Sequence, residues 1–207
     1  MTTGADLLEL SPVIPVVVVD DAAHAVPLAQ ALLRGGIGVI ELTLRTPAAL
    51  DAIERVANEV PDIVIGAGTV TAPEHAAQAA KAGAKFLVTP GTTDRVLDAA
   101  EATGLPFLPG AATVSEVMRL AERGLTALKF FPAEAGGGVA YLKTLAGPLP
   151  QLRFCPTGGI SPSNAPAYLA LSTVGCVGGS WLTPEDALAA GDFGRVEQLA
   201  REAAALR

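Results

Sequence analysis

Lys129 is the residue whose neighbours in the sequence most clearly indicate chemistry. It stands in the run Ala-Leu-Lys-Phe-Phe-Pro, whose apolar residues are typical of a buried strand. Burial disfavours the charged form of an amine unless a counter-charge lies close by. An uncharged lysine amine can attack a ketone and form a Schiff base, so this run predicts a nucleophile. The alternative is a lysine that reaches solvent or serves only in an ion pair.

Glu41 and Arg45, in a second apolar run, strengthen this interpretation. The run reads Val-Ile-Glu-Leu-Thr-Leu-Arg-Thr-Pro. A carboxylate at Glu41 can pair with Lys129 or transfer protons, although a static ion pair fits the same pattern. The planar guanidinium of Arg45 suits a substrate carboxylate, although most arginines simply lie at the surface. The three residues together favour a Schiff-base enzyme over a protein that only binds a ligand.

Two glycine motifs late in the chain predict a phosphate site. Thr157-Gly158-Gly159 and Gly178-Gly179-Ser180 each end an apolar run. Glycine lets backbone N–H groups approach an anion closely, and the N-terminus of a following helix favours negative charge. A single glycine pair would mean little, because turns need glycine anyway. Two such pairs at the ends of successive strands indicate a phosphorylated substrate.

Metal and nucleotide chemistry are disfavoured by the sequence. The two histidines, His24 and His75, lie in helical stretches and have no partner at a metal-ligand spacing. This argues against a metal-dependent class II aldolase or a metal-dependent sugar-phosphate epimerase. Neither a Gly-x-Gly-x-x-Gly loop after a strand nor a P-loop is found. We therefore expect no metal and no cofactor.

Composition limits the partners. The chain has 207 residues, half of them hydrophobic, and a net charge of −7. Because a broad basic surface is absent, we expect no nucleic-acid partner. The apolar run from Pro12 to Val19 is too short to span a membrane, and the first residues lack the basic start of a signal peptide. We expect a cytoplasmic protein with no membrane partner, in which Cys155 and Cys176 are buried thiols.

Eight short apolar runs indicate the fold. They begin near Val13, Ile37, Ile63, Lys85, Pro106, Ala127, Arg153 and Val174. Their apolar residues are consecutive instead of alternating, as expected of parallel strands covered on both faces. The pattern predicts a single α/β domain over residues 1–207, a (β/α)8 TIM barrel with a short helix from Ala5 to Leu10 capping its bottom. An open doubly wound sheet is the alternative, disfavoured because no dinucleotide-binding fingerprint follows the first strand.

Helical patterns separate these runs. They are expected at residues 22–34, 47–59, 73–82, 93–103, 113–123, about 161–171 and 184–205. Thr46 is expected to cap the second helix, and Gly191 to break the last. In such a barrel, catalytic groups lie at the carboxyl ends of the strands, which is where the residues above fall.

The sequence resembles the 2-keto-3-deoxy-6-phosphogluconate (KDPG) aldolase family, whose members are also active as 4-hydroxy-2-oxoglutarate aldolases. The resemblance runs from about Ser11 to the C-terminus and is carried by GGIGVIELTLRT, LPGAATVSE, ALKFFPAEAGGGVAYLKTLAGP, RFCPTGGISPSN and VGGSWL. It implies a class I aldolase that cleaves KDPG to pyruvate and D-glyceraldehyde 3-phosphate, and 4-hydroxy-2-oxoglutarate to pyruvate and glyoxylate. It also implies a place in the Entner–Doudoroff pathway, a homotrimer and no cofactor.

The resemblance further implies a role for each site residue. Lys129 is similar to the Schiff-base lysine of the family, and Glu41 to its proton-transfer glutamate. The implied substrate contacts are Arg45 and Thr69 for the carboxylate, Pro90 and Phe131 for the pyruvyl pocket, Thr157 for the aldehyde half, and Gly158, Gly159, Gly179 and Ser180 for the phosphate.

Two segments depart from the family pattern. Pro-Gly-Thr-Thr at 90–93 stands where an apolar residue more often follows Pro-Gly, and Pro-Gly-Ala-Ala-Thr at 109–113 replaces the more usual Pro-Gly-x-Ser-Thr. Two other functions fit the sequence less well: an aldolase for the galactonate-derived epimer at C4, and a non-catalytic phosphosugar-binding barrel. The motif Glu-Leu-Thr-Leu-Arg-Thr favours the gluconate form.

Overall fold

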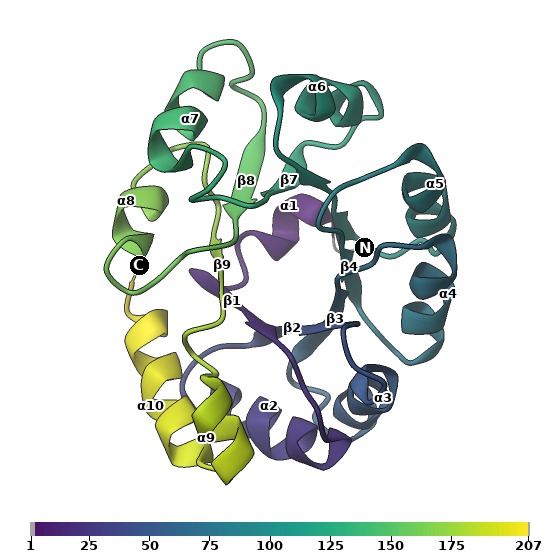
Figure 1. Ribbon diagram of the computed structural model, residues 1–207, viewed down its shortest axis with the longest axis vertical. Helices are drawn as coiled ribbons and strands as arrows, with labels where there is room; N and C mark the ends of the chain where they lie inside the picture. The colour runs from purple at the N-terminus through teal and green to yellow at the C-terminus, as the bar shows by residue number, and fades with distance from the viewer. Residues whose placement is uncertain (1–2, 207) are drawn as a thin grey trace.

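The computed structural model describes residues 3–206 as parallel strands with helices packed around them (Figure 1). The strands are β1 (Val13–Val17), β2 (Val39–Thr43), β3 (Val64–Gly68), β4 (Phe86–Val88), β5 (Phe107–Leu108), β6 (Gly110–Ala111), β7 (Ala127–Phe130), β8 (Arg153–Pro156) and β9 (Val177–Gly179). The helices are α1 (Gly4–Leu7), the 3-10 helix η1 (Ala22–His24), α2 (Ala25–Arg34), α3 (Ala49–Glu59), α4 (Pro73–Lys81), α5 (Asp94–Ala102), α6 (Val114–Glu122), α7 (Gly138–Leu145), α8 (Ala165–Leu169), α9 (Glu185–Ala190) and α10 (Phe193–Ala204).

The strands form two parallel sheets that curl around a common centre (Figure 1). One sheet has the order β5-β4-β3-β2-β1-β9, and the other has the order β6-β7-β8. Only Pro109, which has no backbone N–H to donate, separates β5 from β6. Isolated parallel bridges join Phe154 to Val174 and Thr157 to Gly178, alongside β8 and β9. The predicted α/β architecture with parallel strands is confirmed.

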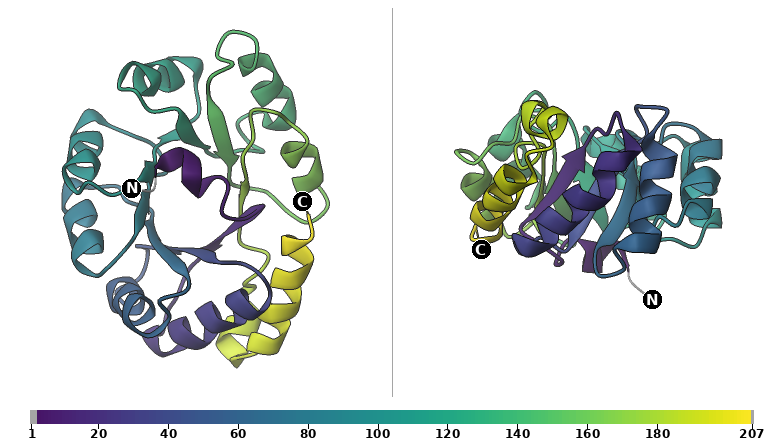
Figure 2. Two further views of the ribbon diagram at one scale, coloured as in Figure 1. Left: turned by 180° about the vertical axis from the view of Figure 1, so that it is seen from behind. Right: turned by 90° about the horizontal axis from the view of Figure 1, so that it is seen from below.

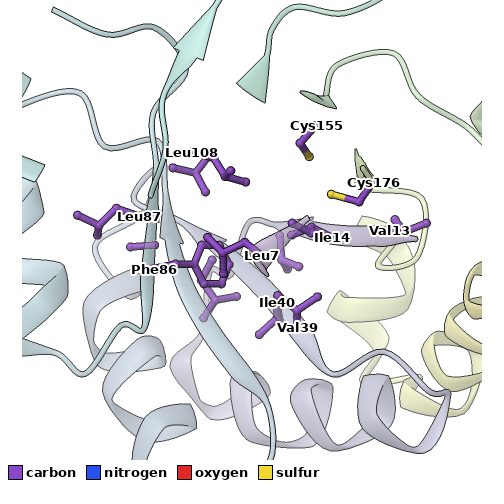
Figure 3. Packing of buried hydrophobic residues seen from close by; sticks show 14 of the residues in the cluster. Leu7, Val13, Ile14, Val39, Ile40, Phe86, Leu87, Leu108, Cys155 and Cys176 are labelled. Atoms are coloured by element: carbon purple, nitrogen blue, oxygen red, sulfur yellow. The ribbon is translucent and has the colours of Figure 1, made fainter. Parts of the chain in front are cut away.

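Apolar side chains cover the strands on both faces. All five residues of β2 and all three residues of β4 are buried, which explains why their sequences show no alternation. Leu7 of α1 is fully buried and lies among strand residues that include Ile14, Ile40 and Phe86 (Figure 3). Cys155 and Cys176 are buried thiols in the same cluster, as predicted.

Helix α1 lies across the N-terminal ends of the strands. A Cβ atom added to Gly4 would lie 3.0 Å from the Phe107 carbonyl oxygen and 3.3 Å from the Ala127 Cβ atom, at the starts of β5 and β7. Viewed from behind, α1 lies over part of the space that the curled strands surround (Figure 2). A short helix therefore lies where the bottom cap was predicted, although it spans Gly4–Leu7 and not Ala5–Leu10. The opposite end of the strands is left for the candidate site.

Several helix starts differ from the sequence-based expectation, since α2 begins at Ala25 after the 3-10 helix η1 and α8 begins only at Ala165. Helix α3 begins at Ala49, later than predicted, because the Thr46 hydroxyl donates to the Val19 carbonyl oxygen at 2.5 Å and does not cap the helix. Helix α7 lies outside the predicted helices, since it opens at Gly137 with φ 106° and no capping side chain, and so carries no usual start signal. The predicted break at Gly191 is confirmed, because its φ of 64° ends α9 before α10 begins.

Gly66 of β3 makes room for a ring in the core. A Cβ atom added there would lie 2.3 Å from the nearest ring atom of Phe86, and Phe86 has no exposed surface onto which to move. We expect Gly66→Ala to lower the free energy of unfolding by about 1–3 kcal/mol, the usual scale for overpacking a core. Urea denaturation measures this difference. Gly38→Ala is the matched control, because a Cβ atom there would meet nothing within 4 Å; equal stability of the two variants would contradict the prediction.

Candidate active site

Lys129 and Glu41 meet between the two curled sheets. The Lys129 Nζ atom donates to Glu41 Oε1 at 3.4 Å, and the two residues are 5% and 3% exposed. Lys129 belongs to β7 in the three-stranded sheet, and Glu41 belongs to β2 in the six-stranded sheet. Their contact therefore crosses the interior from one sheet to the other. The structure removes the alternative in which this lysine reaches bulk solvent.

The position of Glu41 depends on Gly68, at the end of the neighbouring strand β3. A Cβ atom at Gly68 would lie 2.0 Å from Glu41 Oε1 and 2.6 Å from both Cγ and Cδ. The glutamate side chain therefore lies directly against the backbone of residue 68. A side chain at this position would displace the carboxylate from the lysine.

Phe131 contacts both the lysine and one of the glycine loops. The Lys129 Nζ atom is 5.5 Å from the centre of the Phe131 ring. A Cβ atom at Gly158 would lie 3.3 Å from the same ring, and Gly158 has a φ of 101° that suits glycine. The Phe131 ring thus lies between the amine and the Gly158 loop.

Pro90 lies against β6 next to the lysine. A Cβ atom at Gly110 would lie 2.4 Å from the carbonyl carbon and oxygen of Pro90, and Gly110 pairs with Lys129 in the β6–β7 register. The backbone of Pro90 therefore approaches the strand that borders the amine. Pro90 is therefore separated from Lys129 by the backbone of Gly110.

Three hydrogen bonds fix this approach. The Gly110 N–H donates to Thr89 Oγ1 at 2.8 Å, the two hydroxyls of Thr89 and Thr92 lie 2.9 Å apart, and Thr92 Oγ1 donates to the Gly110 carbonyl at 3.0 Å. Thr92 is the residue that departs from the family pattern after Pro-Gly. Its hydroxyl closes a ring of three hydrogen bonds, which we call the Thr89–Thr92–Gly110 ring.

Arg45 and Thr69 lie at the ends of the neighbouring strands β2 and β3. Arg45 is exposed, and no carboxylate among residues 3–206 forms an ion pair with its guanidinium. Thr69 is partly buried and has a φ of 59°. All other described residues with a positive φ are glycines. A positive φ at a β-branched residue is strained, and such strain is typical of functional positions.

The backbone of the Gly158-Gly159 loop presents hydrogen-bond donors. The Gly158 carbonyl accepts from the Glu134 N–H at 3.1 Å, and the Gly159 carbonyl accepts from Asn164 Nδ2 at 3.0 Å. Within residues 3–206, neither the Gly158 N–H nor the Gly159 N–H has a hydrogen-bond acceptor. Both carbonyls are engaged and both N–H groups remain available, as an anion site requires.

The second glycine motif lies beside the first. Gly178 forms a bridge with Thr157, and a Cβ atom at Gly178 would lie 2.2 Å from Thr157 Oγ1. The Gly179 backbone is covered by the ring of Trp181, since a Cβ atom there would lie 1.9 Å from it. Ser180 follows, and it is exposed. The absence of side chains thus lets β8 and β9 approach each other at this end.

A pocket of about 670 Å³ opens beside the strand ends, between the segments that follow β1 and β9. Ser180 and Trp181 line it, whereas Lys129 and Glu41 do not. The pocket therefore does not reach the contact between Lys129 and Glu41. Within residues 3–206, no group of three or more His, Cys, Asp or Glu side chains is arranged to hold a metal ion. No helix in the same range is long and apolar enough to cross a membrane.

Comparisons with known proteins decide the family. Residues 5–199 match the aldolase family described as KDPG and KHG aldolase, in which KHG is 2-keto-4-hydroxyglutarate. The chain belongs to this family. The KHG/KDPG aldolase of Escherichia coli K12 is 54% identical to it over 202 residues, which cover 98% of this chain and 95% of that protein.

Solved structures of KDPG aldolases agree with this assignment. The enzyme of Legionella pneumophila, with pyruvate captured at low pH as a covalent carbinolamine intermediate, is 44% identical. It superposes with a TM-score of 0.96 over 99% of each chain. A structure named native KDPGal is 28% identical, with a TM-score of 0.83 over 92% of this chain and 91% of that one.

Four residues of this KDPG/KHG aldolase family member were missed by sequence reasoning. Thr89 and Thr92 hold β6, while Glu134 and Tyr168 contact each other next to the Gly158-Gly159 loop. Thr92 could have been found, because it departs from the family pattern. Glu134 lies in the Lys-Phe-Phe-Pro-Ala-Glu motif, but nothing in the sequence pairs it with Tyr168.

The Thr89–Thr92–Gly110 ring makes a testable contribution to stability. Thr92→Val keeps the shape of the side chain, but the buried Thr89 hydroxyl loses its contact with Thr92 and the Gly110 carbonyl loses the Thr92 donor. We expect the free energy of unfolding to fall by about 1–3 kcal/mol, the range for an unsatisfied buried polar group. Urea denaturation measures it. Thr126→Val is the control, because Thr126 is exposed; an equally small effect of both substitutions would show that the ring is unimportant.

Proposed function

We propose that this protein is a class I aldolase that cleaves KDPG to pyruvate and D-glyceraldehyde 3-phosphate. The same chemistry would cleave 4-hydroxy-2-oxoglutarate to pyruvate and glyoxylate. The observation that carries the proposal is the buried contact between Lys129 and Glu41 at 3.4 Å. Family membership supports it, since relatives that match over nearly the whole chain are KHG/KDPG and KDPG aldolases.

The framework of the proposal is a single closed (β/α)8 barrel over residues 1–207. Counting β5 and β6 as one strand interrupted at Pro109 gives eight strands. The Lys129 N–H donates to the Pro109 carbonyl at 2.9 Å, which continues the ladder across the interruption. The Thr157–Gly178 bridge links β8 to β9 and supports closure at the other seam.

Lys129 is the proposed nucleophile. Its uncharged amine attacks C2 of the keto acid, and the resulting carbinolamine loses water to give an iminium ion. The iminium withdraws electrons as the C3–C4 bond breaks, so the bonding pair moves into an enamine while the aldehyde leaves. Protonation of the enamine at C3 and hydrolysis of the imine release pyruvate and restore the lysine.

Glu41 is the proposed acid–base group. Its carboxylate takes the proton from the C4 hydroxyl when the C3–C4 bond breaks, directly or through a water molecule. It also serves the earlier proton transfers that form the carbinolamine and remove water. The support is its contact with the amine, together with the Gly68 backbone that holds the carboxylate in place.

The remaining site residues are assigned to substrate binding. The guanidinium of Arg45 pairs with the substrate carboxylate at the rim, aided by Thr69. Pro90 and Phe131 border the pyruvyl half, and Thr157 faces the aldehyde half. Gly158, Gly159, Gly179 and Ser180 receive the phosphate, supported by the available N–H groups of the first two glycines.

The gluconate-derived substrate is preferred over its C4 epimer. Identity is 44% to the KDPG aldolase of Legionella pneumophila and 28% to the KDPGal structure. The homotrimer, the role in the Entner–Doudoroff pathway and the cytoplasmic location remain predictions.

The first test traps the covalent intermediate. Incubation with pyruvate and borohydride should add one fixed mass to the wild-type protein, and peptide mass spectrometry should locate the addition on Lys129. Lys129→Ala should lose both the label and the cleavage of KDPG while it remains folded. Lys143→Ala is the control, because that exposed lysine on α7 should not affect labelling. A wild-type protein that stays unlabelled would disprove the Schiff-base mechanism.

The second test concerns the carboxylate. Glu41→Gln should slow turnover by a factor on the order of 10²–10⁴, the usual contribution of one acid–base group. Gly68→Ala should also lower turnover, by about tenfold or more, because its Cβ atom displaces the same carboxylate. Because Glu41 is buried, urea denaturation is run alongside, so that turnover is compared at equal amounts of folded protein. Gly38→Ala serves again as control, and full activity of Gly68→Ala would show that the observed position of Glu41 is unimportant.

A further inference from the structure

The loop proposed to bind phosphate rests on the segment that follows β7. The Ala133 N–H donates to the Thr157 carbonyl at 2.8 Å, and the Glu134 N–H donates to the Gly158 carbonyl at 3.1 Å. These bonds turn the loop carbonyls toward residues 133 and 134. The conformation in which the Gly158 and Gly159 N–H groups remain available therefore depends on where residue 134 lies.

The Glu134 side chain supports the same loop from one side. A Cβ atom at Gly159 would lie 2.7 Å from Glu134 Cγ and 2.8 Å from Glu134 Cβ, so the stem of the glutamate packs against the glycine backbone. Gly159 has a φ of 78°, a conformation that a side chain would oppose. The Glu134 side chain therefore lies directly next to Gly159, whose N–H is the second available donor of the loop.

The carboxylate of Glu134 is held by Tyr168 of helix α8. The Tyr168 hydroxyl donates to Glu134 Oε1, and Tyr168 is fully buried. Burial, and then the hydrogen bond and charge of Glu134, raise the pKa of the Tyr168 phenol well above its ordinary value, so the hydroxyl keeps its proton. Tyr168 therefore acts as a permanent donor that fixes the direction of the carboxylate.

The direction of the Glu134 carboxylate affects the electrostatic potential at the phosphate-binding loop. A negative charge beside an anion site lowers the affinity for phosphate, and the effect grows as the charge approaches the anion. The bond to Tyr168 holds Glu134 Oε1 near Gly138, at the start of α7. A Cβ atom added to Gly138 would lie 3.4 Å from this oxygen. Without the phenol, the carboxylate would be able to rotate toward the loop.

We propose that Glu134 and Tyr168 are positioning residues that make this enzyme select phosphorylated substrates. The hydrogen bond between them keeps the glycine loop in its donor-presenting conformation and keeps the carboxylate away from the phosphate. Neither residue reacts with the substrate. The proposal rests on the proposed function, because it concerns the phosphate end of the same site.

The decisive variant is Tyr168→Phe, which removes one hydroxyl. We expect the ratio of kcat/KM for KDPG to kcat/KM for the unphosphorylated 4-hydroxy-2-oxoglutarate to fall about tenfold, mainly through a higher KM for KDPG. A structural defect alone would lower both values together. Tyr141→Phe is the matched control, since the Tyr141 ring stacks on Phe130 with centroids 5.4 Å apart and its hydroxyl donates to no side chain in the described range. That variant should keep the wild-type ratio.

A pair of substitutions at Glu134 tests the same bond from the other side. Glu134→Ala removes the stem that packs against Gly159 and should lower the ratio, but by less than Tyr168→Phe because it also removes the negative charge. Glu134→Gln retains an oxygen that can accept from Tyr168, so it should recover most of the ratio that Glu134→Ala loses. This pair also serves if Tyr168→Phe does not fold. A ratio that stays within about twofold of wild type in both Tyr168→Phe and Glu134→Ala would overturn the proposal.

A binding measurement separates this proposal from the aldolase assignment. The affinity for inorganic phosphate, measured by titration calorimetry without any turnover, should be weaker in Tyr168→Phe than in Tyr141→Phe. Equal affinities would overturn the positioning role even if the wild-type protein is an active aldolase. An inactive wild-type protein whose phosphate affinity still depends on Tyr168 would instead refute the proposed function alone.

Discussion

A buried lysine in contact with a buried glutamate is the constraint around which this structure is organised. Either polar group alone would be costly to bury in an apolar interior, and each offers the other a hydrogen-bond partner there. The two residues come from different sheets, so both sheets must curl far enough to bring β2 and β7 together. The same closeness gives the amine a proton acceptor within the interior, where water has little access.

Missing side chains are as important to the site as those present. Four strand or strand-end glycines each leave room for a neighbouring group: Gly66 for Phe86, Gly68 for Glu41, Gly110 for Pro90 and Gly178 for Thr157. Only the first of these neighbours is purely a core residue. The others bring together the carboxylate, the wall beside the amine and the threonine at the glycine loops. Close approach of backbones and side chains is therefore how a small chain fits a complete site into the end of its strands.

Much of this arrangement follows from the sequence. The consecutive apolar runs predicted parallel strands, and Lys129 in the middle of one of them predicted a buried amine. Glu41 was also predicted as its partner, because a carboxylate in a second buried run can pair with a buried amine. Helix α7 was not predictable in the same way, since it begins at glycines without a capping side chain. The contact between Glu134 and Tyr168 was hidden for another reason: α8 packs beside the end of β7 only in three dimensions.

The contact between Lys129 and Glu41 joins positions 88 residues apart in the chain. A pairing of such high contact order forms late, because the entropy of closing a long loop must be overcome before the contact contributes any stability. No fragment that lacks either β2 or β7 contains the pair. Recovery of the paired amine during refolding therefore reports on assembly of the whole ring of strands, and not on the formation of any local unit.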